Sequence, residues 1–251
     1  MNIFETHMHL DLDNFDQDRE QIIQDAQKMG IKKMLNVATD AESSQASLDL
    51  AEKYPCIYAT VGVHPHDAQN LDLEKLRKLA THKKVVAIGE VGLDYFKNYS
   101  PREAQESAFC AQVELAMKLD KPLIIHCRDA YKDCYRILRE YKPKKVLFHC
   151  YSGNYKYAQT LFSHGWLIAL GGAITFNKGA QDELISKMPA NQFVVETDCP
   201  FLTPNPFRGK RNSPLYLPYI IQKIASIRCE SEEKIAKLTY KNACNFFQIR
   251  C

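Results

Sequence analysis

Long apolar runs and glycine-rich turns are scarce in this sequence, and their absence excludes several kinds of protein. No stretch of about 18 apolar residues is present, so no segment is expected to span a membrane. The first 20 residues carry many charges and no apolar core, so we expect no secretory signal. The stretch Gly89-Glu90-Val91-Gly92 has the wrong spacing for a dinucleotide-binding fingerprint. An open, doubly wound α/β sheet is therefore the weaker alternative for the fold.

Cysteine pairs at regular spacings are also missing. The nine cysteines form an odd set without a C-x-x-C motif, which predicts reduced thiols in a cytoplasmic protein and not a disulfide framework. The charges nearly cancel, leaving a formal net charge of +3, which neither demands nor excludes a nucleic-acid partner. No feature of the sequence indicates an obligate protein partner.

Short β-rich runs alternate with longer helical patterns along the chain. Eight strands are predicted, over residues 2–7, 33–38, 56–63, 85–90, 122–126, 145–149, 166–171 and 192–197. Each is followed by a predicted helix, of which the one after the seventh strand covers 180–187. The repeat of about 25–30 residues is that of a βα unit, and eight such units make a closed barrel. We therefore predict a (β/α)8 TIM barrel with residues 1–251 as a single domain.

Potential metal ligands stand at five of the predicted strand ends. In an extended segment His7 and His9 share one face, because successive side chains alternate. The other candidates are Glu90, His126, His149 and Asp198. Any one of them is as easily an ordinary hydrogen-bonded polar residue. However, the carboxyl ends of barrel strands meet at one face, where active sites are built, so together the six residues predict a metal site.

Four imidazoles and two carboxylates exceed what one tetrahedral ion needs, and they suit a pair of divalent ions. We expect Glu90 to bridge the ions, since a shared carboxylate offsets their charge. We expect Asp198 to bind one ion and to take a proton from the nucleophilic water. Water bound to such ions ionises near neutral pH, which supplies hydroxide. The mixed nitrogen and oxygen ligands suit Zn, Mn, Co or Fe, with Mg as a weaker candidate.

Three further residues are candidates for binding substrate phosphate. His64 lies just beyond the third predicted strand, and its alternative role is a hydrogen bond that braces its loop. Arg128 follows His126 by two residues and could grip phosphate, or could pair with a nearby Asp94 or Asp129. Arg208 lies in a basic loop after the last strand, where barrels often bind phosphate, but the loop could also be merely solvated.

Six segments of the chain, taken in order, resemble those of the TatD family of metal-dependent deoxyribonucleases, which belongs to the amidohydrolase-like superfamily. The segments are E-T-H-M-H-L-D (5–11), G-V-H-P-H (62–66), G-E-V-G-L-D-Y (89–95), I-H-C-R-D-A (125–130), H-C-Y-S-G (149–153) and E-T-D-C-P-F-L-T-P (196–204). The family more often has Asp in place of Glu5 and Phe in place of Tyr151, and neither position is a proposed ligand.

The resemblance implies a barrel that hydrolyses phosphodiester bonds of DNA, with 3′–5′ exonuclease activity in some members. It implies that one ion takes His7, His9 and Asp198, that Glu90 bridges, and that the second ion takes two further histidines. These two are His126 and His149. DNA is then the expected partner, bound through its phosphates.

Two other functions remain open on the sequence alone. The same ligands would serve a metal-dependent amide or ester hydrolase, such as an aminoacyl-tRNA deacylase, because that chemistry also needs an activated hydroxide. A barrel with a decayed site could act as a binding or scaffold protein, but all six expected ligands are present.

Overall fold

Strands and helices alternate along the chain in the computed structural model, which describes residues 1–176, 179 and 181–251. Eight strands lie within these described residues, and each is followed by at least one helix. This is the pattern of a (β/α)8 barrel, and it confirms the predicted fold class. The chain divides into two compact units, Asn36–His149 and Met1–Leu35 with Cys150–Cys251, which are described in turn. The interpretation of residues 1–251 as a single domain stays a prediction.

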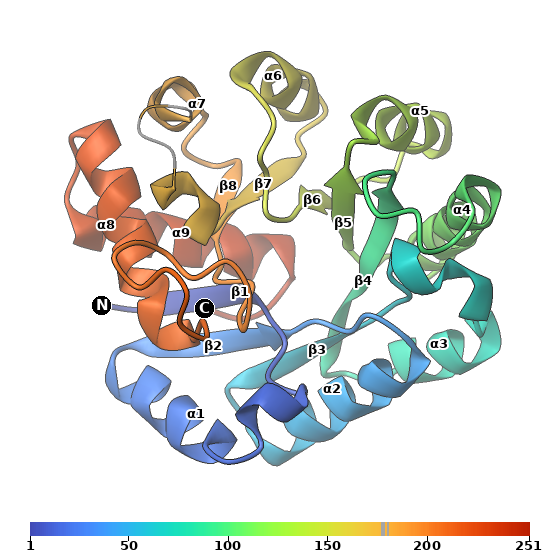
Figure 1. The fold of residues 1–251 in the computed structure, drawn as a ribbon, viewed down its shortest axis with the longest axis horizontal. Helices are drawn as coiled ribbons and strands as arrows, with labels where there is room; N and C mark the ends of the chain where they lie inside the picture. The colour runs from blue at the N-terminus through green and yellow to red at the C-terminus, as the bar shows by residue number, and fades with distance from the viewer. Residues whose placement is uncertain (177–178, 180) are drawn as a thin grey trace. The chain divides into compact units, whose positions relative to one another are not determined.

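The unit Asn36–His149 is a parallel sheet whose strands β3 to β6 follow chain order (Figure 1). Helix α2 packs on β3 and helix α4 packs on β4. The elements, with η for a 3-10 helix, are α2 (Ala41–Lys53), β3 (Ile57–Val61), η2 (Pro65–Asn70), α3 (Leu73–Ala80), β4 (Val85–Asp94), α4 (Arg102–Lys118), β5 (Leu123–Arg128), α5 (Tyr131–Tyr141) and β6 (Val146–Phe148).

Local sequence explains where these elements begin and end. Helix α2 opens with a capping box, in which the Asp40 carboxylate accepts the N–H groups of Glu42 at 2.9 Å and Ser43 at 2.7 Å. The Ser43 hydroxyl in return accepts the N–H of Asp40 at 2.8 Å. These bonds satisfy N–H groups that the first helical turn leaves without partners. The helix stops at Lys53, close before Pro55, because the residue preceding a proline disfavours helical backbone.

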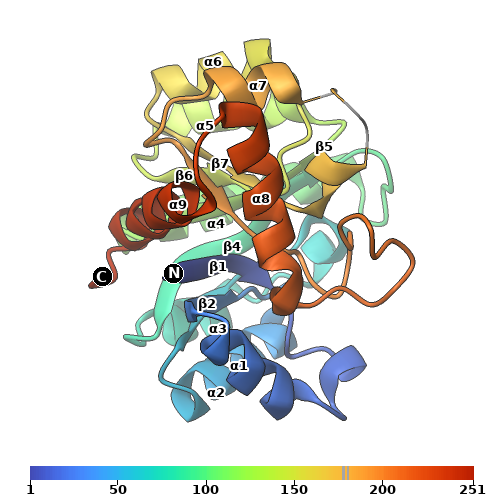
Figure 2. The same ribbon diagram turned by 90° about the vertical axis from the view of Figure 1, so that its left-hand side faces the viewer.

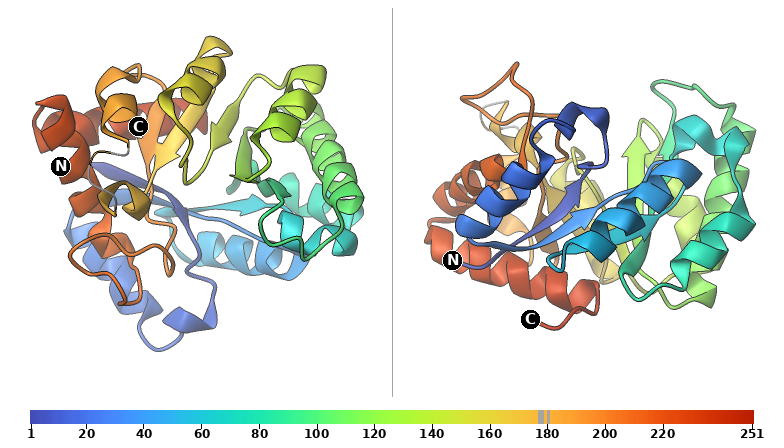
Figure 3. Two further views of the ribbon diagram at one scale, coloured as in Figure 1. Left: turned by 45° about the horizontal axis from the view of Figure 1, so that its top comes forward. Right: turned by 90° about the horizontal axis from the view of Figure 1, so that it is seen from below.

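The other unit combines the two ends of the chain. Strands β7 and β8 pair in parallel, and β1 lies beside β8. Helix α9 packs on β1 and β8 (Figure 3), and α8 packs on α9 (Figure 2). The elements are β1 (Ile3–Met8), η1 (Asp13–Phe15), α1 (Arg19–Lys28), most of β2 (Ile31–Asn36), α6 (Tyr155–Ser163), β7 (Leu167–Leu170), η3 (Gly172–Thr175), α7 (Asp182–Lys187), β8 (Phe193–Val195), η4 (Pro214–Tyr216), α8 (Leu217–Arg228) and α9 (Glu232–Phe246). Ala180, the predicted start of the helix after the seventh strand, lies outside the described residues.

Strand β4 differs from its prediction. It continues beyond Glu90 to Asp94, so the expectation that the fourth strand ends on Glu90 is wrong. Its pairing with β5 shifts register between Ile88 and Val91, and then resumes with Val91 opposite Ile125. Glu90 lies inside this irregularity. A bulge re-aims the side chains around it, which is how a residue inside a buried strand can serve a site.

The second half of β4 depends on one glycine. Gly92 has a φ of 139°, and a Cβ atom there would collide with the carbonyl oxygen of His126. Only glycine allows two backbones to approach this closely in such a conformation. Gly92 therefore brings the β5 backbone at His126 against β4.

The described residues contain no helix that is both long enough and apolar enough to cross a membrane. The cysteines within these residues are free thiols.

Candidate metal-binding site

The unit that joins the chain ends holds a first group of possible ligands, His7, His9 and Asp198. His7 lies in β1, His9 follows that strand, and Asp198 follows β8. The Asp198 N–H donates to the His7 carbonyl at 2.9 Å, which ties the segment after β8 to β1. Asp198 has a φ of 57°, a conformation that aspartate tolerates better than most residues.

The ligand atoms of this group have the spacing that one ion requires. Asp198 Oδ1 lies 3.4 Å from His9 Nε2 and 3.8 Å from His7 Nε2. Ligands about 2.1 Å from a tetrahedral ion are roughly 3.4 Å from one another, so the three atoms fit around a single divalent cation. His7 and Asp198 are both buried, which shields the charge of such an ion from water.

Two buried glutamates support the first group. Glu196 Oε2 lies 4.0 Å from Nδ1 of His7, the ring nitrogen that faces away from Asp198. Glu5 Oε1 accepts the N–H groups of His7 at 3.1 Å and of Thr197 at 2.9 Å, so it joins the same two segments. Burial raises the pKa of Glu5 to about 8.

The unit Asn36–His149 holds a second group, centred on Glu90. Glu90 Oε1 lies 2.7 Å from His126 Nδ1, 2.8 Å from His149 Nε2 and 3.5 Å from His64 Nε2. Burial alone raises the pKa of Glu90, but the electrostatic influence of the neighbouring His149 and His64 rings and hydrogen bonds from His126 and His149 hold it well below its usual range. Glu90 is therefore a carboxylate surrounded by imidazole nitrogens.

The second group has the donor chemistry of a divalent metal site. Burial lowers the pKa of His64, which keeps that imidazole neutral, as a ligand must be. The set of imidazole nitrogens and one carboxylate suits Zn, Mn, Co or Fe. The residues present therefore fit the ion that the sequence predicted.

Asp94, at the end of β4, positions His126. Its Oδ2 atom lies 3.0 Å from Nε2 of His126 and 3.1 Å from Nε2 of His66. His126 thus directs Nδ1 to Glu90 and Nε2 to Asp94, the arrangement in which a carboxylate fixes the tautomer of a ligating histidine. Although burial raises the pKa of Asp94, the hydrogen bond from His126 lowers it overall, so the carboxylate stays charged.

The three predicted phosphate-binding residues have different surroundings. His64 lies in the second ligand group, and its Nδ1 also accepts the N–H of His66 at 3.1 Å, which is the loop-bracing alternative. Arg128 does not pair with Asp94 or Asp129; its guanidinium lies 3.8 Å from the ring centroid of Phe96.

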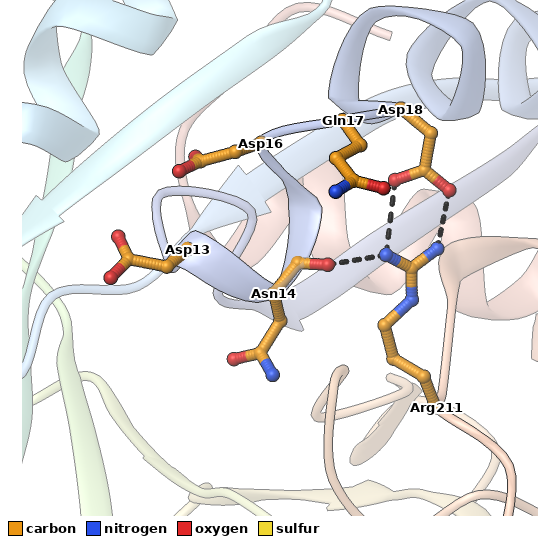
Figure 4. Close-up of a pocket in the computed structure, with 6 residues that line it drawn as sticks. All are labelled: Asp13, Asn14, Asp16, Gln17, Asp18 and Arg211. Carbon is orange, nitrogen blue, oxygen red and sulfur yellow. Dashed lines mark hydrogen bonds and ion pairs between the residues drawn. The ribbon is translucent and has the colours of Figure 1, made fainter.

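The two arginines of the basic loop after β8, Arg208 and Arg211, have different surroundings. Arg208 is exposed, with its guanidinium 3.7 Å from the ring centroid of Phe176. Arg211 is bound to other residues of the protein. Figure 4 shows it facing Asp18 and the carbonyl of Asn14 in a pocket that is partly lined by aspartates. Its two Nη atoms lie 3.0 and 2.5 Å from the Asp18 carboxylate. Arg208 is thus the arginine of this loop that remains accessible to a phosphate.

Sequence reasoning missed the supporting residues more than the ligands. Glu5 lies two positions before His7 in β1, and strand alternation alone would have placed both on one face. His66 lies in the short 3-10 helix η2 and Glu196 lies in an irregular segment after β8, and in neither place does a sequence period predict the direction of the side chain.

Comparison with known proteins identifies the family. The profile described as TatD related DNase matches residues 4–248 of the chain. The chain belongs to the TatD family. The TatD-family relative YabD of Bacillus subtilis, an uncharacterized metal-dependent hydrolase, is 38% identical over 98% of this chain and 99% of its own length. The 3′–5′ ssDNA/RNA exonuclease TatD of Erwinia tasmaniensis is 35% identical over 98% of this chain and 100% of its own length.

A solved TatD homologue has the same fold. The crystal structure of YjjV from Escherichia coli K12 matches with a TM-score of 0.93 at 30% identity, over 99% of this chain and 98% of that one. The TatD-family resemblance inferred from the six motifs is therefore confirmed. The chain is a metal-dependent hydrolase of ester bonds, as the sequence predicted, and divalent metal can bind at its groups of histidines and carboxylates.

Proposed function

We propose that the chain is a 3′–5′ exonuclease that hydrolyses phosphodiester bonds of single-stranded DNA with two bound divalent ions. The observation that carries this proposal is that His7, His9 and Asp198, and likewise His64, Glu90 and His126, have the spacing of metal ligands in a TatD-family chain. The Erwinia relative, named a 3′–5′ ssDNA/RNA exonuclease, supports the polarity and the single-stranded substrate.

Each group would hold one ion. His7, His9 and Asp198 would hold the first, and His126, His149 and Glu90 would hold the second. Barrel strands present their carboxyl ends on one face, which is the physical reason to assign both ions to one reaction. When bound, divalent ions supply hydroxide at neutral pH and neutralise charge on the phosphoryl group.

The protein's own groups would then bind, orient and transfer protons. Asp198 would accept the proton of the attacking water. Asp94 would hold the ring of His126, to which it is hydrogen-bonded at 3.0 Å. His64, Arg128 and Arg208 would contact the phosphates, the arginines through paired N–H donors.

The test uses single-stranded oligonucleotides labelled at one end. Protein stripped of metal should be inactive, and Mg, Mn or Zn should restore cleavage. Oligonucleotide labelled at its 5′ end should give a ladder of shortening products, whereas the 3′ label should be released at once as a mononucleotide. The opposite labelling pattern would contradict the polarity.

A variant pair tests the site itself. Glu90→Gln should abolish turnover without unfolding the chain, because it removes the charge surrounded by imidazoles. Glu114→Gln, on the exposed face of α4, should retain full activity. Cleavage by Glu90→Gln at the wild-type rate would contradict the proposal, as would hydrolysis of aminoacyl-tRNA or simple amides and esters with no cleavage of DNA.

We also propose a cytoplasmic location. The free state of all cysteines in the described residues supports it, since thiols stay reduced in that compartment.

A further inference from the structure

The loop between β4 and α4 exposes two aromatic side chains. Phe96 and Tyr99 are 55% and 65% exposed, more than any other large apolar side chain among the described residues. Single exposed apolar residues are ordinary. Two aromatic rings within four positions, in the unit that holds the second ligand group, form instead a surface on which a flat ligand can stack.

Two cations border these rings. The Arg128 guanidinium lies 3.8 Å from the centroid of Phe96, and Lys97 Nζ lies 5.8 Å from Phe96 and 5.9 Å from Tyr99. Within the residues that the structure describes, neither cation forms an ion pair with a carboxylate. We name Phe96, Lys97, Tyr99 and Arg128 the aromatic platform.

The loop that carries Phe96, Lys97 and Tyr99 of the platform is held by hydrogen bonds at both ends. The buried side chain of Gln105 accepts the Asp94 N–H at 2.9 Å and donates to the carbonyls of Asp94 at 3.1 Å and Ser100 at 2.9 Å. Asp94 Oδ1 accepts the N–H groups of Phe96 at 3.0 Å and Lys97 at 2.9 Å. A loop fixed in this way loses little conformational entropy when it binds a ligand.

The platform adjoins the second ligand group through a short chain of contacts. The rings of Tyr99 and His66 are 4.7 Å apart, and His66 shares the Asp94 carboxylate with His126. The carboxylate that holds His126 is therefore the same one that fixes the backbone of Phe96. Tyr99 is thus connected to His126 of the Glu90 group through His66 and Asp94.

We propose that the aromatic platform binds single-stranded nucleic acid next to the bond to be cleaved, with bases stacked on Phe96 and Tyr99 and phosphates on Lys97 and Arg128. Stacking on an exposed ring requires an unstacked base, which a duplex does not offer, and cations without carboxylate partners suit phosphate. This inference rests on the proposed nuclease function and adds to it the place where the substrate is held.

Binding without turnover tests the platform separately from catalysis. The full chain, stripped of metal with a chelator, is titrated against a fluorescent oligothymidylate of about 12 nucleotides, and anisotropy reports the affinity. Phe96→Ala and Tyr99→Ala should each weaken binding between about 5- and 150-fold, whereas Phe96→Trp should bind like the wild type. Tyr157→Ala is the matched control, since this tyrosine is 53% exposed on α6, and it should leave affinity unchanged.

Salt dependence separates the two kinds of contact. Lys97→Gln and Arg128→Gln should each reduce the slope of log affinity against log salt by about 0.7, because each removes one phosphate contact to a single strand. Phe96→Ala should weaken binding without changing that slope, and it should not alter the weaker binding of a duplex of equal length.

Wild-type affinity in all four platform variants would overturn the inference, and so would an equal loss of duplex binding in Phe96→Ala. Failure of the proposed function has a different signature, in which the wild-type chain cleaves no nucleic acid with any divalent ion, whatever the variants bind.

Discussion

Replacing Asp94 by Asn isolates the role of a carboxylate that touches no proposed ion. The side chain keeps its size, so its oxygen can still accept the N–H groups of Phe96 and Lys97 at the Oδ1 position. The amide NH2 then replaces Oδ2, which lies 3.0 Å from His126 Nε2 and 3.1 Å from His66 Nε2. Two donors would face each other at His126, and the ring would lose the partner that fixes its tautomer.

The size of the effect follows from this geometry. Loss of a carboxylate behind a ligating histidine typically lowers metal affinity 10- to 100-fold, or by about 1.4 to 2.8 kcal/mol. Of the proposed ligands, Asp94 contacts His126 of the second group, so the first group, with His7 and His9, should keep its affinity. The variant is therefore expected to weaken one of two binding events.

Isothermal titration of metal-free protein with Mn or Zn measures both events. Wild-type protein should show two binding events. Asp94→Asn should show one event with unchanged affinity and one with an affinity about 10- to 100-fold lower. Asp49→Asn, at an exposed position on α2, is the control and should leave both unchanged. Unchanged affinity of both events in Asp94→Asn would refute the positioning role.

Further predictions concern pH, packing and salt. Because burial raises the pKa of Glu5 to about 8, above its unfolded value, its protonated form stabilises the fold, and stability falls as pH rises from about 5 to 8. In metal-free protein unfolded with urea, the free energy of unfolding of Glu5→Gln relative to that of the wild type should rise by up to about 3 kcal/mol over that pH range. Parallel curves of unfolding free energy against pH for the two proteins would contradict this. Gly92→Ala should lower the free energy of unfolding by more than about 2 kcal/mol, because its Cβ would meet the His126 carbonyl. Gly165 also has a positive φ but no atom within 4 Å of a built Cβ, so Gly165→Ala should lower the free energy of unfolding by only about 1 kcal/mol. Equal losses in Gly92→Ala and Gly165→Ala would exclude the clash at Gly92. Cleavage should weaken as salt rises, and a salt-independent Michaelis constant would argue against phosphate contacts.

The sequence points to the candidate ligand residues because of where they lie. His149 directly follows β6, and Asp198 follows β8 closely, so the boundary of a buried apolar run points to the next polar residue. The spacing of His7 and His9 required only strand alternation. The eight alternating strands were likewise visible, since short β-rich runs are each followed by a helical pattern.

Contacts between distant segments could not be predicted in the same way. Glu90 lies in a register shift inside β4, and no period in the sequence marks a bulge. The stacking of Arg128 on Phe96 joins residues on different strands and loops, and its sequence neighbour Asp129 was the more obvious partner. Pro65 interrupts strand geometry between His64 and His66, so alternation did not place His64 beside Glu90.

The most direct test of the account is the number of divalent ions that one chain binds. Metal-free protein saturated with Zn or Mn and freed of excess metal should contain two ions per chain by elemental mass spectrometry. His9→Ala, which removes a ligand of the first group only, should contain one. A single ion in the wild-type chain that persists in His9→Ala would contradict the account.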